Sequence, residues 1–157
     1  MININIPGFK NLEIKNLVID YNGTAAVDGT PVKGLKKRIK KLSESIDIHV
    51  ITADTHGNVK KALSDYNCRI IVISGNDQDN AKKEYIKKTG SHHTAALGNG
   101  RNDILMLSEA ALGISVLMDE GCSFKAVAAS DLIVKSVNDA LDLFLKTNRL
   151  KAGLRNG

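Results

Sequence analysis

The stretch Leu17-Val18-Ile19-Asp20-Tyr21-Asn22-Gly23-Thr24 decides the fold of this chain. It opens with an apolar run that does not alternate with polar residues, which is typical of a strand buried on both faces. Asp20 follows at once, and the residues after it form a tight turn. The pattern therefore predicts a carboxylate held still at the end of a buried strand, as a covalent nucleophile requires. The alternative is that Asn22-Gly23 is only a hairpin turn, which Asp20 caps.

Strand-like and helix-like patterns alternate along the rest of the chain. Short apolar runs lie at residues 17–19, 48–51, 69–73, 95–97, 113–116 and 132–134, and helical patterns lie near 33–44, 57–66, 79–89, 102–110, 122–129 and 137–147. This order predicts an α/β fold, a three-layer, Rossmann-like parallel sheet covered by helices on both faces.

Three smaller features complete the expected organisation. Residues 1–157 are expected to form a single domain that starts with a short hairpin at an edge, within residues 1–14. Residues 25–32 are expected to form a small β-hairpin flap that turns at Asp28-Gly29. The tail, residues 151–157, is expected to be frayed.

Composition restricts the class of protein. The chain has 157 residues, of which 43% are hydrophobic and 4% are aromatic, so an aliphatic core is expected. No apolar run approaches the roughly 18–20 residues of a membrane span, and no export signal is visible. Cys68 and Cys122 show no CxxC spacing and are interpreted as reduced thiols. We therefore expect a cytoplasmic protein that does not interact with a membrane.

The net charge of +5 comes largely from the basic segment Lys33–Lys41. Leu35, Ile39 and Leu42 recur there at helical spacing, so the lysines are interpreted as the solvated face of an amphipathic helix. No aromatic side chains interleave with these lysines to stack on bases, and nucleic acid is not expected as a partner. Binding of nucleic acid that weakens steeply with salt would support the alternative.

Further polar groups follow the later predicted strands. Thr52 ends one of them, and its hydroxyl can donate to a phosphate oxygen, although Asp54 or Thr55 can instead be a helix N-cap. A lysine, either Lys82 or Lys83, can neutralise a phosphoryl group, although a surface position is an alternative for each.

The segment Gly98-Asn99-Gly100-Arg101-Asn102-Asp103 follows the next apolar run. Its glycines allow the backbone to approach a ligand closely, and Asn99 and Asp103 offer oxygen ligands for Mg²⁺. The alternative is a glycine turn in which Asn102 or Asp103 caps a helix. Because ligands of such folds bind at the carboxyl ends of the strands, we expect these groups to form a phosphoryl-transfer site with Asp20.

The order of these motifs resembles that of the haloacid dehalogenase superfamily, and most closely the phosphorylation domain of P-type ATPases in soluble form. The resemblance spans about residues 15–147 and is carried by Leu17–Thr24, Val50–Thr55, Lys82–Gly90, Leu97–Leu107, Glu109–Val116 and Ala128–Val134.

The resemblance implies a role for each matched residue. Asp20 becomes the phosphorylated nucleophile, and Thr52 and Lys82 are the other catalytic residues. The implied phosphate-binding residues are Asn22, Gly23, Thr24, Ala53 and Asn102, and the implied Mg²⁺ ligands are Asp20, the backbone carbonyl of Asn22, Asn99 and Asp103.

Two positions depart from the pattern of the superfamily's phosphatases. Asn22 stands where a general acid is usual, and Asn99 stands where a metal-binding aspartate is usual. General acid–base catalysis contributes about 10²–10⁴ in rate. The sequence therefore predicts a slow Mg²⁺-dependent phosphohydrolase, or alternatively a non-catalytic module that binds phosphate or a nucleotide.

The gaps between the motifs leave no room for an inserted cap domain. An open site suits a phosphorylated small molecule or macromolecule as substrate, or closure of the site by a neighbouring subunit of a homo-oligomer.

Overall fold

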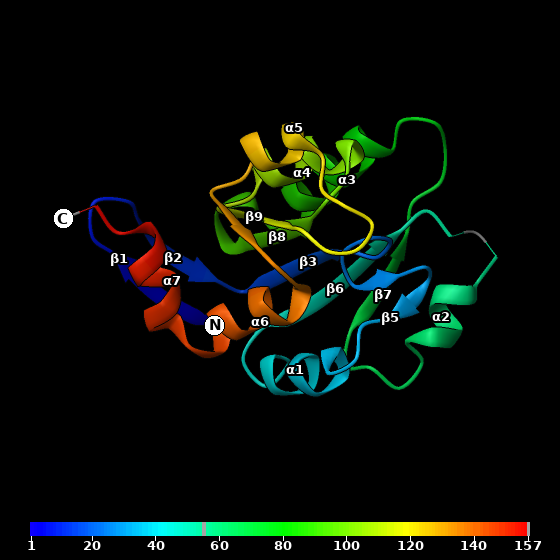
Figure 1. Cartoon of the computed structure of the whole chain (residues 1–157), viewed down its shortest axis with the longest axis horizontal. Helices are drawn as coiled ribbons and strands as arrows, with labels where there is room; N and C mark the ends of the chain where they lie inside the picture. The colour runs from blue at the N-terminus through cyan, green and yellow to red at the C-terminus, as the bar shows by residue number, and fades with distance from the viewer. Residues whose placement is uncertain (55, 157) are drawn as a thin grey trace.

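The computed structural model describes residues 1–54 and 56–156 and contains a six-stranded, fully parallel sheet (Figure 1). The strand order is β10-β9-β8-β3-β6-β7. The strands are β3 (Asn16–Asp20), β6 (Asp47–Thr52), β7 (Arg69–Val72), β8 (Thr94–Gly98), β9 (Leu112–Val116) and β10 (Leu132–Val134). Each contains one of the predicted apolar runs or most of it, and the predicted Rossmann-like α/β class is confirmed.

Helices cover both faces of this sheet. In Figure 1, α3 (Gln78–Thr89), α4 (Ile104–Glu109) and α5 (Phe124–Ala128) lie above it, and α1 (Leu35–Leu42), α2 (Asn58–Ala62) and α6 (Val137–Leu145) lie below. Two 3₁₀ turns, Ser91–His93 and Arg101–Asp103, flank β8. No helix in the described part of the chain combines the length and the apolar character needed to cross a bilayer.

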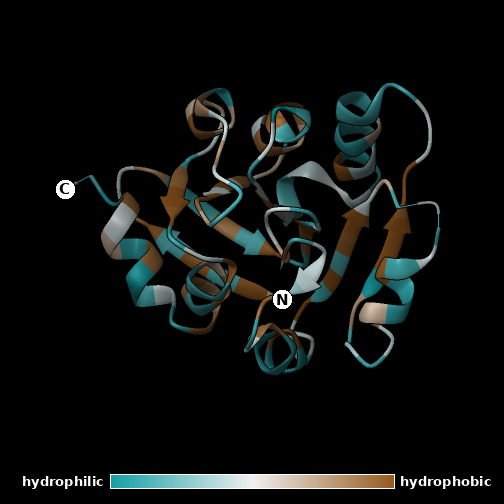
Figure 2. Ribbon diagram, turned by 45° about the vertical axis from the view of Figure 1, so that its right-hand side comes forward, coloured by the Kyte–Doolittle hydropathy of each residue, from teal (hydrophilic) through white to brown (hydrophobic). Residues whose placement is uncertain are grey.

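The central strand contributes side chains to a core on each face. Leu17 and Ile19 belong to the larger core beneath the sheet, whereas Val18 between them belongs to the core under α3 and α4. Figure 2 shows the sheet strands as largely hydrophobic ribbons. This two-sided burial explains why the strands appear in the sequence as continuous apolar runs.

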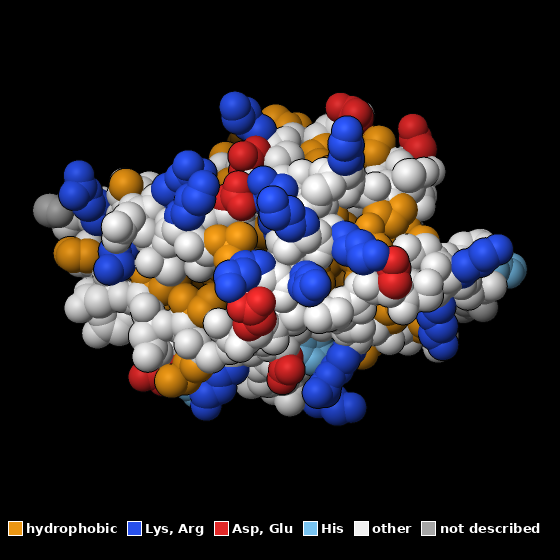
Figure 3. All heavy atoms as spheres, turned by 90° about the horizontal axis from the view of Figure 1, so that it is seen from below, with side chains coloured by type: hydrophobic (Ala, Val, Ile, Leu, Met, Phe, Trp, Pro, Cys, Tyr) orange, Lys and Arg blue, Asp and Glu red, His pale blue; other side chains and the backbone are white. Residues whose placement is uncertain are grey.

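The basic segment Lys33–Lys41 behaves as predicted, because α1 buries Leu35, Ile39 and Leu42 against the sheet. Its lysines point outward. Figure 3 shows this lower face of the molecule, where Lys and Arg side chains stand apart from one another among polar and acidic groups.

The chain changes direction across the sheet at β3. After β3 it builds β6 and β7 on one side, and it then returns to place β8, β9 and β10 on the other side. The point between β3 and β8 is therefore the topological switch point, where ligands of open α/β sheets bind.

The N-terminal hairpin is placed differently from the prediction. Strands β1 (Ile2–Ile6) and β2 (Lys10–Ile14) pair only with each other and form a separate two-stranded sheet rather than an edge of the main one. Ile4, Ile6, Leu12 and Ile14 are buried in the lower core. A free two-stranded ribbon is only marginally stable, so it depends on this packing.

The predicted frayed tail is wrong for the described residues 151–156. Helix α7 (Thr147–Leu154) continues through the expected boundary and buries Leu150 completely. After the helix, the Asn156 N–H donates to the carbonyl of Pro7 at 3.0 Å. The tail is ordered because it covers the apolar side of the N-terminal hairpin.

The flap forms where the sequence predicts it. Strands β4 (Ala26–Val27) and β5 (Thr30–Pro31) pair antiparallel around Asp28 and Gly29. Both turn residues have positive φ, 49° and 75°, which is the backbone of a tight two-residue hairpin.

Candidate active site

Asp20 and Lys82 form a buried ion pair at the switch point. Asp20 is the last residue of β3 and is 7% exposed, and its Oδ1 lies 2.6 Å from Lys82 Nζ. Lys82 is on the second turn of α3 and is 1% exposed. Its neighbour Lys83 is half-buried and forms no ion pair within the described residues. The sequence leaves open whether Lys82 or Lys83 is the lysine of the site, and the structure places Lys82 beside Asp20.

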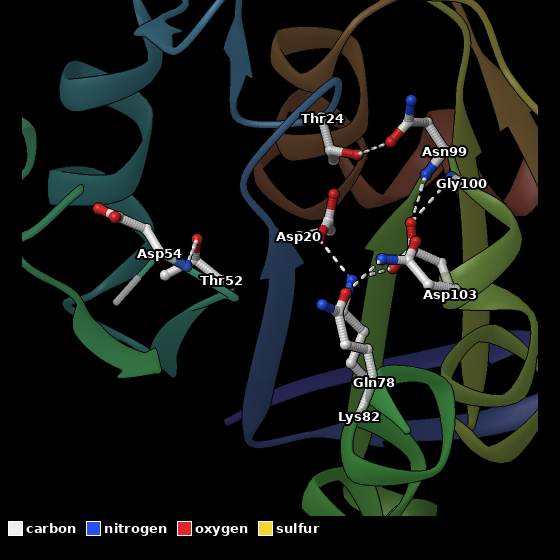
Figure 4. Close-up of polar contacts among 10 residues, drawn as sticks. Asp20, Thr24, Thr52, Asp54, Gln78, Lys82, Asn99, Gly100 and Asp103 are labelled. Carbon is white, nitrogen blue, oxygen red and sulfur yellow. Dashed lines mark hydrogen bonds and ion pairs between the residues drawn. The ribbon is translucent and has the colours of Figure 1, made fainter. Parts of the chain in front are cut away.

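Asp103 completes this cluster from the opposite side of Lys82 (Figure 4). It is fully buried, and its Oδ1 lies 2.7 Å from Lys82 Nζ. Its Oδ2 accepts the N–H groups of Asn99 at 3.0 Å and Gly100 at 2.9 Å. A Cβ at Gly98 would lie 2.6 Å from the Asp103 Cβ, so glycine is needed for this close approach.

The cluster carries an excess of negative charge. Burial, and then the repulsion from Asp103, raise the pKa of Asp20 to about 7, although Lys82 opposes the shift. Burial alone would lower the pKa of Lys82, but the two carboxylates outweigh it and raise this pKa. Two carboxylates share one ammonium group, and this imbalance would be relieved by a cation at Asp20 and Asp103.

Asn99 connects the turn after Asp20 to the loop that follows β9. Its Oδ1 accepts the Thr24 hydroxyl at 3.1 Å, and its Nδ2 donates to the Gly121 carbonyl at 3.1 Å. Gly23 has φ of 78°, and a Cβ there would lie 2.3 Å from Asn99 Nδ2. The amide is thus held at both ends and positions the Gly23-Thr24 turn over the site.

Thr52 lies at the end of the neighbouring strand β6 and is 2% exposed. Asp20 is in register with Ile51, so Thr52 lies one residue further toward the carboxyl edge. Its Oγ1 accepts the Asp54 N–H at 3.1 Å, which leaves the hydroxyl hydrogen free to donate to a ligand.

The N-cap residue of α2 is Gly57 rather than the predicted Asp54, although the Asp54 side chain still bonds to the start of the helix. Its carboxylate accepts the N–H groups of Val59 at 2.8 Å and His56 at 2.9 Å, and these bonds lower the pKa of Asp54. Thr55, the alternative cap, lies outside the described residues.

The other predicted phosphate-binding residues lie around the cluster without bonding to it. Asn22 is exposed and lines a 250 Å³ pocket together with Tyr21, Gly29 and Asp54. Within the described residues its side chain forms no hydrogen bond, and Ala53 packs against the core under α3 and α4. Asn102 is exposed, and its Nδ2 donates to Gln78 Oε1 at 3.3 Å. Of the predicted residues, the structure thus joins Asp20, Thr24, Lys82, Asn99 and Asp103 through direct side-chain contacts.

Two hydrogen bonds with side chains hold the flap, and sequence reasoning found neither. Tyr21 Oη donates to the Gly29 carbonyl at 2.8 Å, and the Asp28 N–H donates to Glu120 Oε1 at 2.8 Å. Sequence reasoning also missed Gln78 and the Gly121 carbonyl. These pairings join residues far apart in the chain, and no local motif reveals them. For Gln78 alone, its position one turn before Lys82 was a usable signal.

The fold and the site together indicate a protein that can bind a divalent cation and a phosphate group. The reason is that two carboxylates lie on either side of a lysine at the switch point of a parallel sheet.

Comparisons with known proteins identify relatives of the sequence. No protein-family model matches the chain. An uncharacterised protein of Methanocaldococcus jannaschii is 49% identical over 74 residues, which are 47% of this chain and 80% of that protein. A protein of the same organism named soluble P-type ATPase-like phosphatase is 24% identical over 138 residues. That match covers 83% of this chain but only 50% of the relative.

Solved structures show the same architecture. The 3-deoxy-D-manno-octulosonate 8-phosphate phosphatase of Moraxella catarrhalis, in complex with magnesium, phosphate and KDO, is 25% identical with a TM-score of 0.63, over 88% of this chain and 90% of that one. The cobalt-bound deoxy-D-mannose-octulosonate 8-phosphate phosphatase of Haemophilus influenzae has a TM-score of 0.72 at 14% identity, over 89% and 92% of the two chains.

The chain belongs to the haloacid dehalogenase superfamily, as its motifs predict. Within this superfamily it is in the same family as the uncharacterised Methanocaldococcus protein.

Proposed function

We propose that this protein is a Mg²⁺-dependent phosphohydrolase that works through an aspartyl phosphate on Asp20. The observation that carries the proposal is the Asp20–Lys82–Asp103 cluster at the switch point of the sheet. The names of the similar proteins support the reaction class, because they include two phosphatases of the same sugar-acid phosphate and a soluble P-type ATPase-like phosphatase.

In the proposed first step, a carboxylate oxygen of Asp20 attacks the phosphorus of a phosphomonoester. The bond between phosphorus and the ester oxygen breaks, and the leaving alcohol takes its proton from water because Asn22 has no proton to give. Lys82 offsets the charge of the attacking carboxylate, and the Thr52 hydroxyl donates to a phosphoryl oxygen.

In the second step, water attacks the phosphorus of the aspartyl phosphate. The bond between phosphorus and the Asp20 oxygen breaks, which releases inorganic phosphate and restores the carboxylate. Without a base at position 22 this step is slow, so the phosphoenzyme is expected to persist.

The residues present fit a magnesium ion. The described residues contain no group of three or more His, Cys, Asp or Glu side chains that could hold a metal. Mg²⁺, however, is usually bound through one or two carboxylates plus waters, and Asp20 and Asp103 provide these. The Asn22 carbonyl and Asn99 are the further proposed ligands. When bound, the ion would screen the repulsion between the carboxylates and the incoming phosphate.

The proposed substrates are phosphorylated small molecules, nucleotides or a phosphorylated macromolecule. Closure by a second copy of the chain remains a prediction, and light scattering on the purified protein would test it.

The test compares wild type with Asp20→Asn. We expect phosphate release from a panel of phosphomonoesters and nucleotides with Mg²⁺, and none with EDTA or from the variant. Beryllium fluoride, which mimics the aspartyl phosphate, should raise the melting temperature of wild type only. No release, combined with no effect of beryllium fluoride, would contradict the proposal.

One observation favours a second candidate, a regulatory module that binds phosphate or a nucleotide without turnover. The position of the usual general acid is occupied by Asn22, which is exposed and unbonded within the described part of the chain. A protein that binds phosphate analogues tightly but releases no phosphate from any substrate would establish this alternative.

A further inference from the structure

A groove of about 400 Å³ opens beside the candidate active site. One wall is the start of α3, with Gln78 and Asp79, and the other contains Arg101, Asn102 and Lys125. Its volume is within the range of small-molecule sites in proteins. None of the reactions described above uses Arg101 or Lys125.

The groove is lined by more positive than negative charge. Arg101 comes from the 3₁₀ turn after β8 and Lys125 from α5, and neither forms an ion pair within residues 1–54 and 56–156. Asp79 is the one acidic residue that lines the groove, and its Oδ1 accepts the Asn80 N–H at 3.0 Å at the start of α3. A guanidinium and an ammonium group without carboxylate partners are suited to binding a carboxylate or a phosphate.

The groove adjoins the Asp20 cluster through two of its lining residues. Gln78 lies one helical turn before Lys82, and Asn102 directly precedes Asp103. The hydrogen bond from Asn102 to Gln78 joins the two walls at this point. Figure 4 shows Gln78 next to Lys82 and Asp103. A molecule that places its phosphate at Asp20 would thus need only a short spacer to reach the groove.

We propose that the groove binds a second anionic group of the substrate, with Arg101 and Lys125 as its specificity-determining residues. The preferred substrates are then phosphate esters that also carry a carboxylate or a second phosphate. This inference rests on the proposed function, since it takes the phosphate of the ester to lie at Asp20.

The test uses phosphonates, because their carbon–phosphorus bond is not hydrolysed and binding is measured without turnover. Calorimetry with Mg²⁺ compares 3-phosphonopropionate and propane-1,3-bisphosphonate with propylphosphonate, which lacks the second anionic group. The proteins are wild type, the double variant Arg101→Ala/Lys125→Ala, and the control Lys40→Ala, which removes an exposed cation of α1. Equal melting temperatures show that the variants are folded.

Wild type and Lys40→Ala are expected to bind at least one doubly anionic probe about fivefold or more tightly than propylphosphonate. In the double variant this ratio should fall to about one, and added salt should reduce it in wild type. The stronger of the two doubly anionic probes identifies the second group as a carboxylate or a phosphate.

Equal binding of all probes by wild type would overturn the inference, as would a ratio that survives in the double variant or no binding of any probe. Hydrolysis is scored separately. If wild type prefers a doubly anionic probe, the double variant loses this preference and no ester is hydrolysed, the proposed function alone is refuted. If wild type hydrolyses esters but binds all probes equally, the groove assignment alone is refuted.

Discussion

Asn22 is the residue to which the proposed slow turnover is attributed. It follows Asp20 by two residues, is exposed, and has an amide that cannot exchange a proton. Asn22→Asp is expected to raise kcat by about 10²-fold, because it would supply an acid for the leaving group and a base for water. Phosphate-release kinetics check this expectation. An unchanged kcat in a variant that still binds beryllium fluoride would support the binding-module alternative.

Lys82 and Lys83 are adjacent in sequence but differ in what their loss should cost. Lys82→Met leaves Asp20 and Asp103 buried without their cation, so we expect a loss of about 3–5 kcal/mol in the free energy of unfolding, together with loss of phosphate release. Lys83→Met is the matched control and should change stability by no more than about 0.5 kcal/mol. Urea unfolding of both variants measures the difference, and equal losses would show that the buried cluster is not the source.

The candidate site was only partly predictable at this scale. Residue types and their order at the strand ends identify Asp20, Thr52 and Asp103, because each either ends a buried strand or follows its glycine turn. The choice of Lys82 depends on the helical phase set by the start of α3, which the adjacent lysines do not reveal. The orientation of the Asn99 amide arises from partners 75 and 22 residues away in the chain. No local pattern encodes contacts of that range.

At the scale of elements, the flap is attached to the loop after β9 by one side chain. Glu120→Ala removes the acceptor of the Asp28 N–H, so the amide of Asp28 should exchange with deuterium severalfold faster. The melting temperature should stay the same, because the bond is exposed. Asp119→Ala, at an exposed neighbour, is the control. Unchanged exchange at Asp28 would show that Glu120 does not restrain the flap.

A bidentate ion pair joins helices α1 and α6. Arg38 Nε and Nη2 lie 2.8 and 3.1 Å from the two carboxylate oxygens of Asp142, and this contact holds the pKa of Asp142 below its ordinary value of 3.8. A carboxylate whose pKa falls on folding adds stability above its unfolded pKa and loses it as the pH falls through the lower, folded value.

Asp142→Asn is therefore expected to cost about 0.5–1 kcal/mol of unfolding free energy between pH 5 and 8. The difference from wild type should shrink as the pH drops below about 4. Urea titrations at pH 7 and pH 3 measure it. A cost that is as large at pH 3 as at pH 7 would indicate that the amide disturbs packing rather than the ion pair.

At the scale of the whole molecule, the parallel sheet was predictable and the position of the hairpin was not. Strands buried on both faces appear in the sequence as apolar runs, and their alternation with helices fixes the class of fold. The N-terminal hairpin carries its own alternation, as Ile4, Ile6 and Ile14 show, but this pattern does not say what covers it. Its cover is α7, whose single fully buried residue gives too weak a helical signal to be recognised.

The role of α7 in stability can be measured at Leu150, which is 0% exposed. Leu150→Ala should cost about 2–5 kcal/mol of unfolding free energy, through lost burial and the cavity that it leaves. Leu145→Ala, at a residue that is 37% exposed, is the control and should cost much less. If both substitutions cost the same, α7 would not be packed on the hairpin as described.

The packing of α7 on the hairpin also has a consequence for how the protein is made. The apolar side of the hairpin leaves the ribosome early, whereas Leu150 is among the last residues to be translated. At about 5–20 residues per second, roughly 7–27 seconds separate the synthesis of Ile14 and Leu150. During that interval the apolar side of the hairpin is not yet covered by α7, and a chaperone that binds exposed apolar segments would find its target there.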